Sequence, residues 1–267
     1  MARQVHMPDL TAGQQQAAAD MARVALAAQQ RVLGLEHPEA LDSMHNLSIR
    51  LAELGQHQAA AVMARQALAG QQRVLGPEHP SSLDSMSNLS SCLAELGQHS
   101  AAVDIAREAL AVQQRVLGRD HPRTLDSMHN FSIRLAKLGL HQAAANMALK
   151  VLDTQKRVLG REHPRTLDSM FNFSIRLAEV GLHQAAANTA REALAAQQRV
   201  LGPEHPSTLK SMSNLSSCLA ELGQHQAAAD MAREALAAQQ RVLGPEHPDT
   251  LKSMSNLSVR LENSGRQ

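Results

Sequence analysis

One period of 42 residues runs through the whole sequence. Six His-Pro pairs begin at His37, His79, His121, His163, His205 and His247, each 42 residues after the one before it. The register has no insertion or deletion, and residues 75–100 and 201–226 are nearly identical. Self-similarity at a fixed period of about 20 to 50 residues is typical of solenoids and repeat arrays. The sequence therefore predicts copies of one structural unit, each stacked on its neighbours.

Each unit is predicted to contain two α-helices, which we name helix A and helix B. In residues 38–76, apolar and small residues of helix A recur at steps of three and four, at Leu41, Met44, Leu47, Ser48, Leu51 and Leu54. A second stripe defines helix B, at Ala60, Met63, Ala64, Ala67, Leu68, Val74 and Leu75. Gly55 and Gly76 are expected to end the two helices in the left-handed conformation, and Pro80 prevents continuation. His37 falls at the N-cap of helix A, and Pro38 suits its first turn.

The predicted fold class is all-α, a right-handed solenoid of antiparallel helix pairs. The pattern gives twelve helices, because it starts with a helix B over roughly residues 14–33 and ends with a helix A. Residues 1–12 are expected to form an irregular segment, and residues 13–265 a single array of about six units. The polar C-terminal sequence LENSGRQ is typical of a solvated cap, although a truncated chain would look the same.

Composition argues against several classes of partner. The formal net charge is +1 and the sequence pI is about 8.0, so the basic surface that nucleic acids or anionic membranes require is not expected. Trp and Tyr are absent, which removes the usual platforms for base stacking. No long apolar run indicates a signal peptide or a membrane span, and a cytoplasmic location is expected. Cys92 and Cys218 lie three repeats apart, too far for a disulfide between stacked helices.

Histidine, serine and aspartate recur together, but their repetition argues against catalysis. A catalytic triad is one asymmetric constellation, whereas these residues return in every unit. The His-Pro series could supply metal ligands or general bases, or it could cap helix A; equivalent positions in stacked repeats are too far apart for ligands about 2 Å from one metal. A second histidine series lies in the turn of the helical hairpin, between helix A and helix B, and receives the same structural interpretation, at His57, His99, His141, His183 and His225. We expect no enzyme activity, metal or cofactor.

The unit resembles the tetratricopeptide repeat. That repeat places its signature large, small, large, glycine and two alanine residues at the positions of Leu47, Ser48, Leu51, Gly55, Ala60 and Ala67. The 42-residue period, the linker LGPEHPSTL and the asparagine of helix A are similar to the kinesin light chain type of repeat, over residues 13–265. The resemblance concerns the repeat type and not a complete motor subunit. It implies a non-catalytic scaffold that binds a protein or an extended peptide on a concave face lined by helix A.

On this resemblance, an unbroken asparagine series belongs to the exposed part of helix A, at Asn46, Asn88, Asn130, Asn172, Asn214 and Asn256. An amide both donates and accepts, so a row of asparagines can satisfy the backbone of an extended peptide. Matching asparagines contact peptide ligands in kinesin light chain type repeats. The alternative is that each asparagine bonds to the neighbouring helix and holds the stack.

Charge on the same face changes sign along the sequence. Acidic residues at Asp42, Asp84, Asp126 and Asp168 are followed by Lys210 and Lys252. This order could orient a ligand that has a basic and an acidic end, or it could reflect drift on a solvated face. Three residues break the repetition and are candidates for local specificity, namely His45, His129 and Phe171. Besides a scaffold, the alternative function is a sensor or regulatory array detached from a larger signalling protein, such as a nucleotide-dependent switch.

Overall fold

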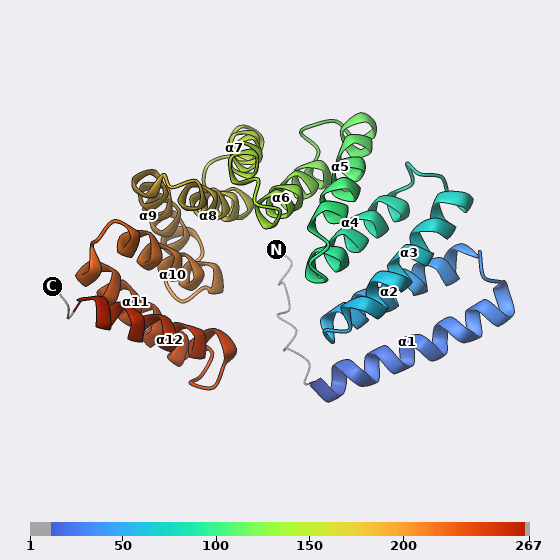
Figure 1. Ribbon diagram of the computed structural model, residues 1–267, viewed down its shortest axis with the longest axis horizontal. Coiled ribbons are helices and arrows are strands. Elements are labelled where there is room, and N and C mark those ends of the chain that lie inside the picture. Colours follow the sequence, from blue (N-terminus) through green and yellow to red (C-terminus); the bar gives the residue numbers. More distant parts are fainter. Residues whose placement is uncertain (1–11, 265–267) are drawn as a thin grey trace. The chain divides into compact units, whose positions relative to one another are not determined.

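The computed structural model describes residues 12–264, and this part of the chain contains twelve α-helices and no strand (Figure 1). The helices of type B are α1 (Ala12–Leu33), α3 (His57–Val74), α5 (His99–Val116), α7 (His141–Val158), α9 (His183–Val200) and α11 (His225–Val242). The helices of type A are α2 (Pro38–Glu53), α4 (Pro80–Glu95), α6 (Pro122–Lys137), α8 (Pro164–Glu179), α10 (Pro206–Glu221) and α12 (Pro248–Ser264). The predicted all-α repeat fold is therefore confirmed.

The helices divide into two compact units, with the boundary between Leu138 and Gly139. Unit 1 contains α1 to α6, and unit 2 contains α7 to α12. Within each unit, every helix packs on the next helix along the chain. Helix A also contacts helix A of the following pair, as α2 with α4 and α8 with α10. The predicted irregular segment, residues 1–12, lies outside the described residues except for Ala12, and the single array over 13–265 stays a prediction.

Local signals set the ends of the helices. Nδ1 of His37 accepts a hydrogen bond of 3.3 Å from the backbone N–H of Glu39, which fixes the start of α2. The same cap recurs at His79, His121, His163, His205 and His247. Gly55 and Gly76 have φ angles of 72° and 95°, the left-handed conformation expected at helix ends. The predicted caps and stops are confirmed.

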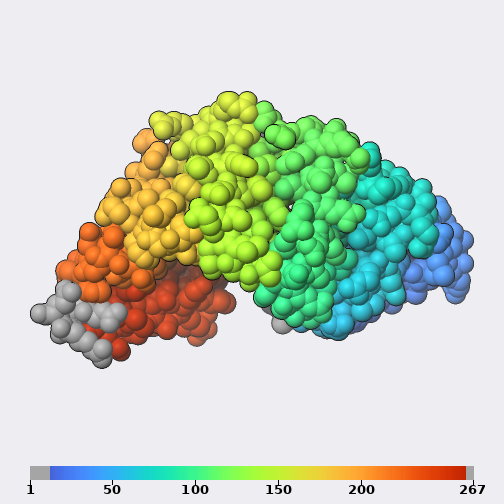
Figure 2. Space-filling view, turned by 45° about the horizontal axis from the view of Figure 1, so that its top comes forward, coloured from blue at the N-terminus to red at the C-terminus, as the bar shows by residue number. Residues whose placement is uncertain are grey.

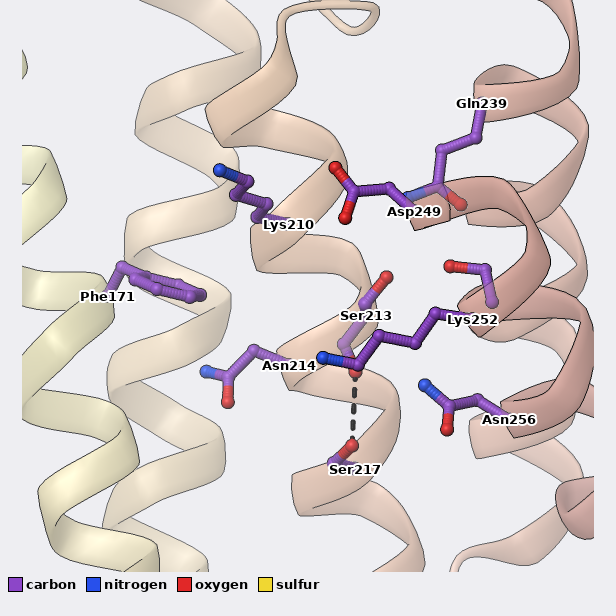
Figure 3. Close-up of a pocket in the computed structure, with 10 residues that line it drawn as sticks. Phe171, Lys210, Ser213, Asn214, Ser217, Gln239, Asp249, Lys252 and Asn256 are labelled. Carbon is purple, nitrogen blue, oxygen red and sulfur yellow. Dashed lines mark hydrogen bonds between the residues drawn. The ribbon is translucent and has the colours of Figure 1, made fainter. Parts of the chain in front are cut away.

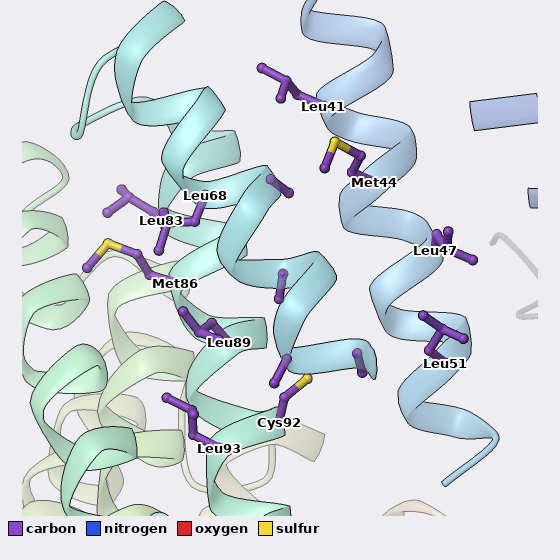
Figure 4. Packing of buried hydrophobic residues seen from close by; sticks show 14 of the residues in the cluster. Leu41, Met44, Leu47, Leu51, Leu68, Leu83, Met86, Leu89, Cys92 and Leu93 are labelled. Carbon is purple, nitrogen blue, oxygen red and sulfur yellow. The ribbon is translucent and has the colours of Figure 1, made fainter. Parts of the chain in front are cut away.

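The core consists of leucines and methionines from helix A and alanines from helix B. Figure 4 shows this packing in unit 1, where Leu41 and Leu47 of α2 are 2% and 1% exposed. Ala60 and Ala64 of α3 are fully buried, and their small side chains let the helices approach closely. Placing Val74 in this stripe was wrong, because it is 43% exposed. Val74 is the last residue of α3, and it faces solvent together with the adjacent Arg73, whereas Gln71 in the same turn is buried.

The packing within each unit leaves few gaps on the face seen in Figure 2, where side chains of successive helices lie against one another. Within residues 12–264, no helix combines the length and the apolar character needed to cross a membrane.

Candidate functional site

A pocket of about 320 Å³ opens on the helix A side of unit 2 (Figure 3). It is lined by one residue of α8, four of α10, one of α11 and four of α12, namely Phe171, Lys210, Ser213, Asn214, Ser217, Gln239, Asp249, Lys252, Ser253 and Asn256. Five of these residues belong to the set predicted from the sequence, two lysines, two asparagines and Phe171. The structure therefore brings part of the predicted set together in one place.

The 42-residue register explains how the lysines and asparagines meet. Lys210 on α10 and Lys252 on α12 occupy the same position of successive repeats, and both side chains are exposed. Asn214 and Asn256 each follow four residues later, which is about one helical turn. Figure 3 shows the Lys252 side chain extending from α12 toward α10. The pocket therefore carries two positive charges next to two amides.

Phe171 supplies an aromatic ring at the α8 end of this polar pocket (Figure 3). The equivalent position is His45 in one earlier repeat and Ser213 in the next one, so the ring is specific to α8. Its side chain is half-buried. An acidic group, Asp249 at the start of α12, also faces the pocket. The site thus combines cationic, anionic, amide and aromatic groups, a mixture suited to a peptide segment.

The asparagines of the series form different hydrogen bonds. Nδ2 of Asn214 donates a hydrogen bond of 2.7 Å to Oγ of Ser174, which in turn donates to the carbonyl of Phe171 at 2.6 Å. In unit 1, Asn88 donates to Ser48 in the same way. Asn172 instead donates to the carbonyl of Asp168 on its own helix, at 2.8 Å.

The remaining three asparagines, Asn46, Asn130 and Asn256, have exposed side chains. The bonds made by Asn88 and Asn214 join one helix A to the previous one, which is the contact that the stacking interpretation predicts. The exposed side chains are free to meet a ligand without breaking the stack. The stacking interpretation therefore describes Asn88 and Asn214, and the ligand-binding interpretation stays a prediction for the exposed members.

A buried glutamine series was missed by the sequence reasoning. Its members on helix B are between 1% and 4% exposed, at Gln71, Gln113, Gln155, Gln197 and Gln239. Nε2 of Gln71 donates to Oδ1 of Asp42 at 3.1 Å. At the pocket, Lys210 takes the place of that aspartate; the buried Oε1 atoms of all five glutamines have no partner among the described residues. The recurrence of glutamine at the 42-residue period was a signal that could have revealed the series.

The helix A side of unit 1 differs in charge. Arg123 of α6 forms an ion pair with Asp84 of α4, with 2.6 Å between Nη2 and Oδ2. Nδ1 of His45 lies 2.9 Å from Oγ of Ser85. Burial lowers the pKa of His45, although the nearby carboxylates Asp84 and Asp42 oppose this effect. Three other predicted residues, Asp126, Asp168 and His129, each take part in an interaction.

The histidine and cysteine candidates lie at the starts of helices and in the core. Among the described residues, no three histidine, cysteine or acidic side chains gather where they could hold a metal. Cys92 and Cys218 are free thiols in the core, and burial raises the pKa of both. The second histidine series begins helix B in five pairs, at His57, His99, His141, His183 and His225.

The comparison with family models agrees with this architecture. One model of the tetratricopeptide repeat matches residues 10–39, 40–81, 82–123 and 124–165, and another model of the same repeat matches residues 177–241. The chain therefore belongs to the tetratricopeptide repeat family. Folds of this family generally mediate interactions between proteins.

Solved structures refine the class to the kinesin light chain-like type of repeat. A kinesin light chain candidate from Podosopora anserina with nearly identical TPR-like repeats is 31% identical, with a TM-score of 0.68; the match covers 77% of this chain and 97% of the other. BtubC (BKLC) from P. vanneervenii is 17% identical, with a TM-score of 0.69, over 90% of this chain and 95% of its own. The second likeness concerns the fold alone. No curated protein sequence matches the chain.

Proposed function

We propose that this chain is a non-catalytic scaffold that binds an extended peptide or a partner protein on its helix A face. In unit 2, the pocket receives an acidic part of that ligand. The observation that carries this proposal is the pair of exposed amines, Lys210 and Lys252, at the rim of a pocket that also contains the exposed amide of Asn256.

The polar groups of the pocket match the needs of a peptide. The ammonium groups of Lys210 and Lys252 attract carboxylates and steer an acidic ligand toward the site. The exposed amide of Asn256 adds one donor and one acceptor beside these groups.

The asparagine series contributes to binding through its exposed members. Asn88 and Asn214 hold the stack through Ser48 and Ser174, so their Nδ2 groups are already committed. We assign ligand contacts instead to Asn46, Asn130 and Asn256. The acidic side chains of unit 1, beginning with Asp42, are proposed to favour basic parts of a ligand there.

Two labelled decapeptides test the charge preference. One alternates glutamate and serine, the other lysine and serine, and fluorescence anisotropy measures the affinity of each for the intact chain. We expect the variant Lys210→Glu/Lys252→Glu to lose affinity for the acidic peptide, because two attractive charges become repulsive. Its preference between the two peptides should shift toward the basic one.

A matched control changes two lysines on a helix of type B. Lys150→Glu/Lys156→Glu makes the same change of net charge on α7, away from the pocket. This control should keep the preference of the unchanged chain. Equal losses in both variants would show that net charge alone acts, and no loss in either would place the ligand elsewhere.

A further inference from the structure

The helix A surface that packs on helix B elsewhere is uncovered on α12. Leu251 and Met254 are 53% and 44% exposed, whereas the equivalent Leu209 and Met212 of α10 are 1% and 3% exposed. Leu261 is also 39% exposed. The residue types are the same as in the buried copies, so α12 keeps an intact stacking surface. Among the described helices, α12 packs on α11.

The complementary surface of helix B is uncovered on α1. Ala25 is exposed, while every equivalent residue of the other helices B is at most 2% exposed, at Ala67, Ala109, Val151, Ala193 and Ala235. Met21 is 74% exposed, although the equivalent Met63 and Met231 are partly buried against the core. Among the described helices, α1 packs on α2. Within the described residues, α12 thus has a helix A face and α1 a helix B face that no described helix covers.

An arginine and a glutamate form an ion pair within other helix pairs of the chain. The equivalent arginine also lies on α1, and the equivalent glutamate lies before α12. Arg73 on α3 binds Glu36, which precedes α2, at 2.7 Å. The same bridge, always 37 residues apart, joins Arg115 to Glu78, Arg199 to Glu162 and Arg241 to Glu204. Arg31 on α1 and Glu246 before α12 are exposed and have no such partner among the described residues. In a further repeat, the arginine that pairs with Glu246 would lie 37 residues after it, at position 283. That position is six periods of 42 residues after Arg31, so Arg31 is equivalent to it in the repeat register.

We propose that α1 of a second copy of this chain packs against α12, so that two copies join head to tail and complete one helix pair. The contact continues the interface already formed between helix A and helix B within each pair. Arg31 of one copy then meets Glu246 of the other in the register of the four existing bridges. Exposed ion pairs add little affinity, so the apolar faces hold the copies together and the charges set their register.

The contact uses a different surface on each copy. Such heterologous contacts leave one α1 and one α12 free at the ends of every assembly that does not close into a ring, and further copies can add. The mass in solution is therefore expected to rise steadily with concentration rather than stop at a dimer.

Two blocked variants test the contact by complementation. Leu251→Glu places a charge on the α12 face, and Ala25→Glu places one on the α1 face. Sedimentation analysis over about a hundredfold range of concentration should show growing mass for the unchanged chain and a monomer for each variant. An equimolar mixture of the two variants should form a dimer and nothing larger, because it contains one intact face of each kind.

Controls separate the contact from general effects of charge. Val24→Glu lies on the same helix and is 71% exposed, but glutamate is found at this position in other repeats, at Glu108, Glu192 and Glu234. It should associate like the unchanged chain. Arg31→Glu should weaken association, and Arg31→Glu/Glu246→Arg should restore it. Circular dichroism checks that every variant is folded.

Three results would overturn the proposal. The first is an unchanged chain that stays monomeric over the whole concentration range. The second is a mixture of folded Leu251→Glu and Ala25→Glu variants that forms no dimer. The third is association of the unchanged chain that neither substitution reduces, which would mean that copies meet through another surface.

Discussion

The side-chain amide of Gln71 donates a 3.1 Å hydrogen bond to Asp42, so a buried residue of helix B holds the first acidic residue of the helix A face. The same spacing of 29 residues separates Gln239 from Lys210, where the charge is opposite. The buried glutamine is therefore retained whether an aspartate or a lysine lies 29 residues before it.

Loss of the Gln71 amide is expected to destabilise unit 1. Gln71→Ala removes a hydrogen bond and leaves a gap at a position that is 1% exposed, so unfolding by urea should cost about 1–3 kcal/mol less. Gln72→Ala, at the next and less buried position, is the matched control and should have little effect. Equal effects of the two substitutions would argue against a special role for the buried amide.

The asparagine series should separate into two groups by stability. Asn88→Ala and Asn214→Ala each remove a bond between successive helices A and should lower the free energy of unfolding by about 0.5–1.5 kcal/mol. Asn130→Ala removes an exposed side chain and should leave it nearly unchanged. Urea titrations followed by circular dichroism measure both. A loss of stability in Asn130→Ala as large as in Asn88→Ala would contradict the division.

Stability should also depend on His45 at acidic pH. Burial lowers the pKa of His45 from its ordinary value of 6.5, against the opposing attraction of Asp84 and Asp42. As pH falls through 6.5, the unfolded chain therefore takes up a proton at this residue before the folded chain does. The free energy of unfolding should decrease below that pH, and it should decrease less in His45→Asn. Identical pH profiles of the two proteins would rule out this linkage.

Gly70 is expected to tolerate alanine in spite of a close neighbour. A Cβ at Gly70 would overlap Cδ2 of Leu41, but both residues line a pocket of about 640 Å³ into which that flexible side chain can turn. The equivalent pair in the next repeat, Val112 and Leu83, already accommodates a larger residue. Gly70→Ala should therefore gain up to about 1 kcal/mol from helix propensity. A lower urea midpoint would instead show that Leu41 cannot move.

Local chemistry explains why much of the fold could be predicted. A histidine before proline can accept the N–H two residues later, and Gly55 can adopt a positive φ, whatever surrounds them in the stack. The stripes of leucine and alanine likewise depend only on the helical period. These features recur in every 42-residue repeat, so the interpretation of one repeat applied to all twelve helices of the described chain.

Contacts between repeats were harder to predict because they depend on the orientation of the neighbour. Asn88 and Asn130 occupy the same position, yet one bonds Ser48 and the other is exposed. Ser90, the serine that Asn130 would need, donates to the carbonyl of Ala102 on α5, whereas Ser48 donates to the carbonyl of His45 on its own helix. The direction in which the serine points is decided by packing. The 42-residue period alone does not show which arrangement each asparagine and its serine adopt.

The pocket of unit 2 can be observed directly through its aromatic ring. The chain contains three phenylalanines and no other large aromatic residue, so labelling with 4-fluorophenylalanine gives three fluorine signals. Phe171→Leu identifies the signal from the pocket. Phe131, which lies in unit 1 and is 7% exposed, serves as an internal reference.

Titration of this labelled protein with the glutamate and serine decapeptide tests the proposed binding site most directly. We predict that the Phe171 signal shifts in proportion to the bound fraction, that the Phe131 signal does not move, and that Lys210→Glu/Lys252→Glu abolishes the shift. Binding of the peptide measured by anisotropy with no change at Phe171 would contradict the assignment of the ligand to this pocket.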